Sequence, residues 1–185
     1  VWQHIAERNQ IGCGSAPMVR HACFETVGVF DRNLTPVEDW DMWIRIATRY
    51  PFAVLKEPLT YYRQLPTSSS KNAKKMEQSF HLAIEKTFQS ASPEQLYLKS
   101  CSYHHAYLCL AWKCLQAEDK DYRQARHYYA AAVASNPRLR YSVECVRLKL
   151  ALTLIGWLGI DGYHKVLNIV YALRRHISDF VHQPS

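Results

Sequence analysis

The chain has 185 residues, a length that fits one domain or two small ones and allows a sizeable buried core. Hydrophobic residues make up 48% and charged residues 21%, a globular composition that excludes extensive disorder. The 23 lysines and arginines outnumber 16 acidic residues and give a net charge of +7, which suits an anionic membrane surface, an anionic substrate or nucleic acid alike.

Six cysteines lack both a CxxC pair and the spacing of metal ligands, so we predict reduced, mostly buried thiols of a cytosolic protein. They are Cys13, Cys23, Cys101, Cys109, Cys114 and Cys145. The opening VWQHIAERNQ is polar and has no signal-peptide pattern, which predicts a cytoplasmic chain that is part of a longer protein. The longest apolar run, Leu150 to Ile160, is about half the length that spans a bilayer and predicts a buried or interfacial helix.

The first third of the chain mixes strand and helix patterns. Residues 15–20, SAPMVR, favour a short strand. Residues 21–28 favour a two-turn helix that ends at Gly28, because glycine is preferred just past a helix end. After the turn-forming FDRNL and a further helix, residues 51–64 are rich in β-branched and aromatic side chains and predict two short strands separated at Pro58.

The helix between these segments has a strong start signal. Thr35 is expected to cap it, with Pro36 at the first helical position and Glu38 completing a capping box. Pro51 is expected to end it. One apolar face, predicted to pack on a sheet, carries Trp40, Trp43, Ile44 and Ala47.

The stretch QLPTSSSKN at 64–72 is typical of a linker and predicts a boundary between residues 1–66 and 67–185. Beyond it the pattern is helical throughout. Ser92 and Pro93 give one helix a clear start, and Asn136 with Pro137 gives another a clear end. The predicted helices cover residues 72–89, 93–117, 121–137, 140–158 and 162–181.

Two of these helices resemble a tetratricopeptide helix pair near residues 101–137. The resemblance lies in the spacing of Ala125, Tyr129, Ala132 and Pro137, which are expected to face Tyr107, Leu110, Ala111 and Cys114. Only one unit is visible, so we predict a single helical hairpin.

Three carboxylates crowd the start of the helix after Pro36: Glu38, Asp39 and Asp41. The simplest explanation is that acidic side chains near a helix N-terminus interact favourably with its dipole. Asp39-Trp40-Asp41 is also a DxD pattern, which in many sugar transferases holds a metal-bound nucleotide diphosphate. Side chains two positions apart on a helix point about 200° away from each other, so these two aspartates are not expected to share a metal.

Residues 14–70 resemble the C-terminal half of the catalytic domain of a family 2 glycosyltransferase of the GT-A fold. The resemblance rests on three ordered pieces. They are Arg20, Phe24, Glu25, Val27, Gly28, Phe30 and Asp31, then EDWDMWIRIA from Glu38 to Ala47, then Tyr62, Arg63 and Ser68 to Ser70. The implied fold class is α+β, mostly α, with part of a GT-A α/β catalytic domain in residues 1–66 and an all-α extension in 67–185.

The resemblance implies that Asp39 is the general base that deprotonates the acceptor hydroxyl in an inverting sugar transfer. The helix N-terminus should lower the pKa of Asp39 while nearby indoles raise it by desolvation, and the sequence leaves the sign of the sum open. Trp40 and Trp43 are expected in the core, with stacking on a sugar as the alternative. Residues implied on the substrate-binding side are Glu38, Trp40, Asp41, Gly14, Ser15 and Arg63, although a glycine turn explains Gly14 and Ser15 equally well.

In the family, a histidine often follows the arginine of the Tyr-Arg pair by two residues, whereas this chain has Leu65 there. The nucleotide-binding strand and the donor-metal DxD of the N-terminal half have no counterpart either. The resemblance therefore implies a nucleotide-sugar donor, a glycan acceptor and a divalent metal (Mg or Mn) held by residues outside this chain. By itself the chain is expected to be inactive or nearly so.

Outside residues 14–70, the sequence has no pattern of a metal site or a nucleic-acid-binding module, but it has a basic last part. His104 and His105 lack the spacing of a metal site and are expected to be ordinary core or surface residues. No nucleic-acid-binding module is recognisable. Basic residues of the last part could contact an anionic membrane, peripherally at its inner face, or a protein partner. They are Arg138, Arg140, Arg147, Lys149, Lys165, Arg174 and Arg175. The alternative to a transferase is thus a non-catalytic helical module that binds protein or membrane.

Overall fold

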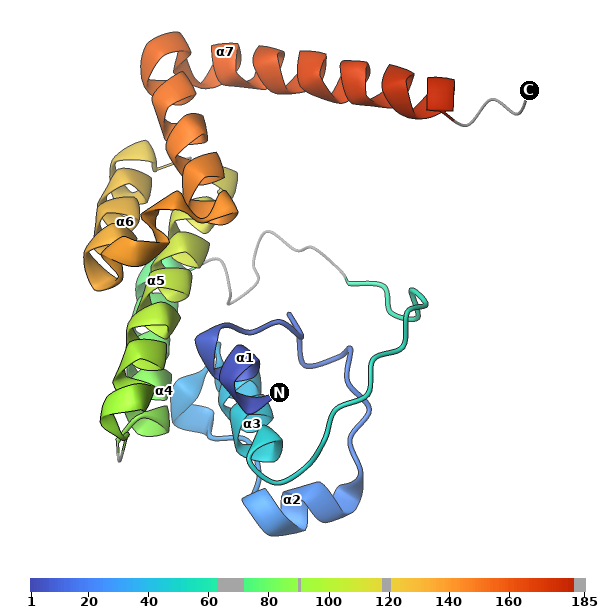
Figure 1. Ribbon diagram of the computed structural model, residues 1–185, viewed down its shortest axis with the longest axis vertical. Helices are drawn as coiled ribbons and strands as arrows, with labels where there is room; N and C mark the ends of the chain where they lie inside the picture. Colours follow the sequence, from blue (N-terminus) through green and yellow to red (C-terminus); the bar gives the residue numbers. More distant parts are fainter. Residues whose placement is uncertain (63–71, 90, 118–120, 182–185) are drawn as a thin grey trace. The chain divides into compact units, whose positions relative to one another are not determined.

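The computed structural model describes residues 1–62, 72–89, 91–117 and 121–181, and all regular secondary structure in these ranges is helical (Figure 1). The chain forms two compact units, Val1–Tyr141 and Ser142–Ser185. The predicted mostly-α character is confirmed. The catalytic-domain boundary predicted near residue 66 falls inside the first unit, whose helices come from both sides of it.

The first unit is built around α5 (Pro93–Gln116), its longest described helix. α5 packs against α1 (Trp2–Glu7), α4 (Ala73–Thr87) and α6 (Tyr122–Ser135), and α3 (Glu38–Ala47) packs against α1 and α4. The shorter elements are α2 (His21–Val27), η1 (Arg32–Leu34) and η3 (Pro137–Tyr141).

Several predicted helix ends are confirmed. Ser92 caps α5 in a capping box with Gln95, and Pro93 is its first residue. Asn72 caps α4 by accepting a hydrogen bond from the backbone amide of Lys75 at 2.9 Å. α2 ends at Gly28, whose φ of 81° lies in the left-handed region that glycine adopts without steric cost.

The predicted capping box of α3 is wrong. The helix begins at Glu38, and Val37 precedes it without any side-chain cap. Thr35 instead closes η1, since its hydroxyl donates to the carbonyl of Arg32 at 3.2 Å. Its own carbonyl accepts from the hydroxyl of Ser79 on α4 at 2.8 Å. A tertiary contact therefore fixes Thr35 and Pro36 ahead of the helix, where local sequence favoured a cap.

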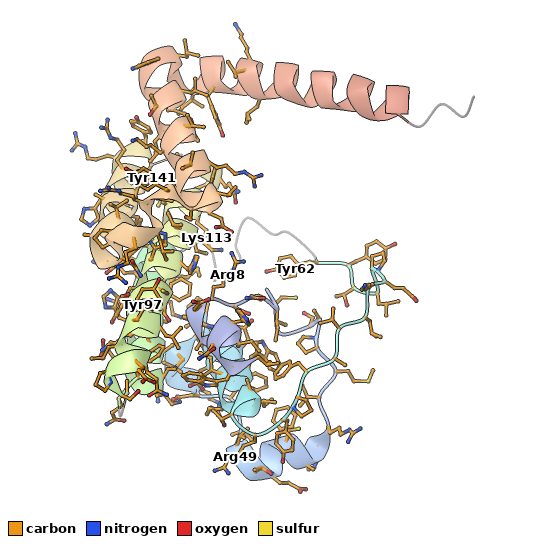
Figure 2. The ribbon with its side chains drawn as sticks, in the orientation of Figure 1. Arg8, Arg49, Tyr62, Tyr97, Lys113 and Tyr141 are labelled. Carbon is orange, nitrogen blue, oxygen red and sulfur yellow. The ribbon has the colours of Figure 1, made fainter. Side chains whose placement is uncertain are left out.

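The predicted strands at 15–20 and 51–64 are also wrong where the structure describes them. Both stretches run without regular structure as far as residue 62, and residues 63 and 64 lie outside the described part. A strand needs a neighbour to satisfy its backbone groups, and the described residues offer none. Apolar side chains of these stretches, such as Met18 and Tyr61, are fully exposed, and Tyr62 projects at the end of the second stretch (Figure 2).

The apolar face of α3 packs on helices, where the sequence predicted a sheet. Trp40 is 2% exposed, and its indole NH donates to the carbonyl of Ile5 in α1 at 2.6 Å. On the other side its ring meets Phe80 of α4 edge-on, with centroids 5.6 Å apart. α1 is tied in turn to α5, because the buried hydroxyl of Ser102 donates to the carbonyl of Ala6 at 2.7 Å.

The predicted helical hairpin is present as α5 and α6. Ala125 and Ala132 of α6 are fully buried, which lets the two helices approach closely. The buried tyrosine between them is Tyr128, where the sequence pattern pointed to Tyr129. Tyr128 lies three residues after Ala125 and stacks on Tyr107 of α5, with centroids 6.2 Å apart. Pro137, also expected in this contact, is exposed and begins η3.

The second unit contains α7 (Val143–Val181), which covers both of the last predicted helices. Gly159 interrupts it with a φ of 70°, at the predicted break. The expected start at 140 is shifted to Val143 because η3 occupies the preceding residues. Among the described residues, no helix is sufficiently long and apolar to cross a membrane.

A buried carboxylate, Asp41, holds four elements of the first unit together. It is 2% exposed and forms ion pairs with Arg45 at 2.9 Å and Lys86 of α4 at 3.1 Å. Lys86 also pairs with Asp31, the cap of η1, at 2.9 Å. Arg45 donates further to the carbonyls of Val27 and Val29 at the end of α2. We call these four charged residues the Asp41 network.

Replacing Asp41 with asparagine should lower the free energy of unfolding by about 2 kcal/mol, because both cations lose their buried counter-charge. The loss stays below that of a fully buried pair, since the Arg45 and Lys86 side chains are 24% and 40% exposed and can be hydrated. Urea denaturation measures it. Asp31→Asn, which removes a half-buried carboxylate from the same lysine, should cost less. Equal losses would contradict a central role for Asp41.

Candidate functional site

The candidate site lies at the start of α3, where the loop between α1 and α2 passes Asp39. The loop follows Arg8, at the C-terminal end of α1 (Figure 2). It brings Gly14 so close that a side chain there would place its Cβ 3.9 Å from the Cβ of Asp39. The structure therefore brings together two predicted site residues that are 25 positions apart. The neighbouring Ser15 is exposed.

Both hydrogen bonds to the Asp39 carboxylate reach the same oxygen. Its Oδ1 accepts from the backbone amide of Trp40 at 2.7 Å and from the side-chain amide of Asn9 at 3.4 Å. No other described residue donates a hydrogen bond to Oδ2. One oxygen of this carboxylate is thus positioned by hydrogen bonds from Trp40 and Asn9.

Burial raises the pKa of Asp39 above its ordinary value of 3.8. The hydrogen bond from the Trp40 amide opposes this effect, the charge of Glu38 adds to it, and the hydrogen bond from Asn9 again opposes it. The net shift of the Asp39 pKa, whose direction the sequence left open, is therefore upward. A raised pKa makes the ionised carboxylate a stronger base, as proton abstraction requires.

Asn9 was not predicted to belong to the site. Its side-chain oxygen accepts from the backbone amides of Ile11 at 3.2 Å and Gly12 at 3.1 Å, so it also shapes the loop that carries Gly14. The short-range turn has a sequence signal, an asparagine shortly before a glycine. The contact with Asp39, 30 residues further along the chain, has none.

Asp41 points away from this site, as the helical spacing predicted. It belongs to the Asp41 network, whereas Asp39 contacts Asn9 on another side of the helix. The two aspartates therefore do not converge on one ion. Nowhere in the described ranges do three histidine, cysteine, aspartate or glutamate side chains gather as metal ligands would.

The other predicted site residues lie around α3 in different environments. Trp40 and Trp43 are both 2% exposed, so both rings lie in the core as the apolar stripe predicted. Glu38 is half-buried, and its Oε2 is enclosed without a hydrogen-bond partner among the described residues. Arg63 and the predicted Ser68 to Ser70 lie outside the described residues.

The remaining histidine and cysteine predictions concern the helical part. His104 is buried, and its Nδ1 lies 2.8 Å from the carbonyl of Ala132, which makes it a core residue between α5 and α6. All six cysteines are free, four of them buried and two partly exposed, as expected.

Comparison of the chain with family models, curated proteins and solved structures gave no match.

Replacing Asp39 with asparagine should leave the protein at least as stable as the wild type at neutral pH. Because the folded-state pKa is raised, the native state binds more protons than the unfolded state between 3.8 and that pKa. The Asp39 contribution to stability therefore falls as the pH rises through this window. Urea unfolding across a pH series should show the free energy of unfolding of the variant increasing relative to that of the wild type as the pH rises.

Asp31 provides the matched control, because the hydrogen bond from Lys86 lowers its pKa. Folding favours the ionised form of Asp31, so Asp31→Asn should be less stable than the wild type at neutral pH. The difference should shrink below pH 3.8, as the pH falls through the lowered pKa of Asp31. If the two variants responded to pH with the same sign, the burial assigned to Asp39 would be wrong.

Replacing Asn9 with aspartate should raise the pKa of Asp39 further. The variant keeps the side-chain oxygen that accepts hydrogen bonds from the backbone amides of Ile11 and Gly12. It replaces the group that donates to Asp39 with a second negative charge. Carboxyl-carbon NMR titration measures the shift. Asn33→Asp, within η1, should leave the pKa of Asp39 unchanged. An unchanged pKa in Asn9→Asp would show that the 3.4 Å contact is not formed in solution.

Proposed function

We propose that this chain carries the acceptor side of an inverting glycosyltransferase site, of family 2 and GT-A type, with Asp39 as general base. The observation that supports the proposal is the environment of Asp39. Asp39 has a raised pKa, one of its oxygens accepts hydrogen bonds from Trp40 and Asn9, and Gly14 approaches it without a side chain.

In the proposed reaction, Asp39 accepts the proton of an acceptor hydroxyl as the hydroxyl oxygen attacks the anomeric carbon of the donor sugar. The bond from that carbon to the nucleotide diphosphate breaks as the new glycosidic bond forms. The nucleotide diphosphate leaves with the electron pair, and attack from the opposite face inverts the anomeric configuration. Oδ2 is the oxygen placed to take the proton, because Oδ1 already accepts two hydrogen bonds.

The donor side of the site belongs, in this proposal, to residues outside the chain. The Mg or Mn ion of the complete enzyme is proposed to bind there too, in keeping with the divergence of Asp39 and Asp41 and the absence of a metal-ligand cluster among the described residues. Asp41 then acts on the acceptor side only indirectly. It holds α3 to α4 and to η1, and so fixes the helix that carries Asp39.

The test needs a longer chain in which this sequence is joined to a nucleotide-sugar-binding half. Nucleotide diphosphate release from a panel of nucleotide sugars, with Mg or Mn and glycan acceptors, should fall about 10²- to 10⁴-fold in Asp39→Asn. Binding of the donor should be unchanged. The acid limb of the wild-type rate profile should lie above the ordinary aspartate value of 3.8, because the pKa of Asp39 is raised.

Asp121→Asn is the control for the same chemical change at a carboxylate outside the Asp41 network, since asparagine can still cap α6, and it should retain the wild-type rate. Equal rates in wild type and Asp39→Asn would remove Asp39 from the mechanism. The absence of nucleotide diphosphate release with every donor would favour the other candidate, a non-catalytic helical module. The observation that supports this candidate is the close packing of α5 against α6.

A further inference from the structure

One apolar face in the first half of α7 is exposed to solvent. Val143, Val146, Leu150 and Trp157 are all exposed, and Trp157 is 81% exposed. They are spaced three, four and seven residues apart, which places them within about 60° of one another around the helix. We call them the exposed stripe.

The exposed stripe is not part of the ordinary apolar face of a packed helix. The buried apolar residues of α7 lie on a different side, at Cys145, Leu148 and Leu152. Single exposed apolar side chains are common on protein surfaces, whereas a contiguous row that includes a tryptophan indicates a binding surface.

Basic residues border the exposed stripe on both sides. Arg147 lies about 40° beyond Val143, and Lys149 lies about 60° beyond Val146 in the other direction. Both side chains are exposed. Long basic side chains at the margins of an apolar face can reach upward to anionic headgroups while their methylene groups stay against the acyl chains. An indole is likewise suited to the boundary between headgroups and hydrocarbon.

We propose that the exposed stripe of α7 binds the surface of an anionic lipid bilayer, with Trp157 and Leu150 inserted and Arg147 and Lys149 at the headgroups. A second copy of the chain fits the stripe less well, because face-to-face packing would bring these cations together. Glu144 is the single acidic residue between Val143 and Ile160, and it lies off the stripe. The proposal is independent of the glycosyltransferase reaction.

The test is co-sedimentation of the whole chain with vesicles of phosphatidylcholine alone or mixed with phosphatidylglycerol. The chain should bind the mixed vesicles, and raising the salt concentration should weaken the binding. Leu150→Ser with Trp157→Ser should weaken it at least about tenfold. Leu96→Ser, which removes an equally exposed leucine from α5, should have no effect.

A second pair of variants tests the charges without touching the apolar residues. Arg147→Glu with Lys149→Glu should abolish the preference for anionic vesicles, whereas Lys74→Glu with Lys75→Glu on α4 changes the net charge equally and should preserve it. The proposal is overturned if the chain stays in solution with both vesicles, or if each control variant loses as much binding as its counterpart. It is also overturned if sedimentation equilibrium shows a dimer that the Leu150 and Trp157 variants dissociate.

Discussion

The carboxylate of Asp41 is the point at which α2, η1, α3 and α4 are joined. It faces two cations from a buried position, and each cation reaches another element, Arg45 the end of α2 and Lys86 the cap of η1. A buried charge without partners is costly, so folding requires that these groups meet. The orientation of α3, and with it the direction of Asp39, follows from that requirement.

Asp39 and Asp41 show how two identical side chains on one short helix acquire different properties. Asp41 is surrounded by opposite charge and fixes the fold. Asp39, on another side of the helix, has a neutral amide and a carboxylate as neighbours, and burial raises its pKa. In the proposed reaction, the first aspartate holds the helix in place and the second accepts the proton. If Asp39 is the base, as proposed, the two acids at the start of α3 serve two separate roles.

Local signals predicted most helices correctly and failed where a distant contact intervened. Ser92, Asn72 and Gly28 act within a few residues, so their patterns could be interpreted directly. Thr35 is bound by η1 and by Ser79, 44 positions away, and the cap predicted from its neighbours does not form. The extended segments before α2 and after α3 have strand-like composition, but a strand depends on a partner that composition cannot supply.

The sequence by itself determined the helical character of the chain, the amphipathic face of α3 and the divergence of Asp39 from Asp41, because helical periodicity alone places side chains around an axis. Only the tertiary structure decided which residues surround Asp39. Asn9 and Gly14 reach it through a loop, and the burial of Asp39 in the folded chain raises its pKa although the hydrogen bond from Asn9 lowers it. The desolvation of a carboxylate depends on which distant segments cover it, so the pattern of its neighbours in the sequence cannot predict it.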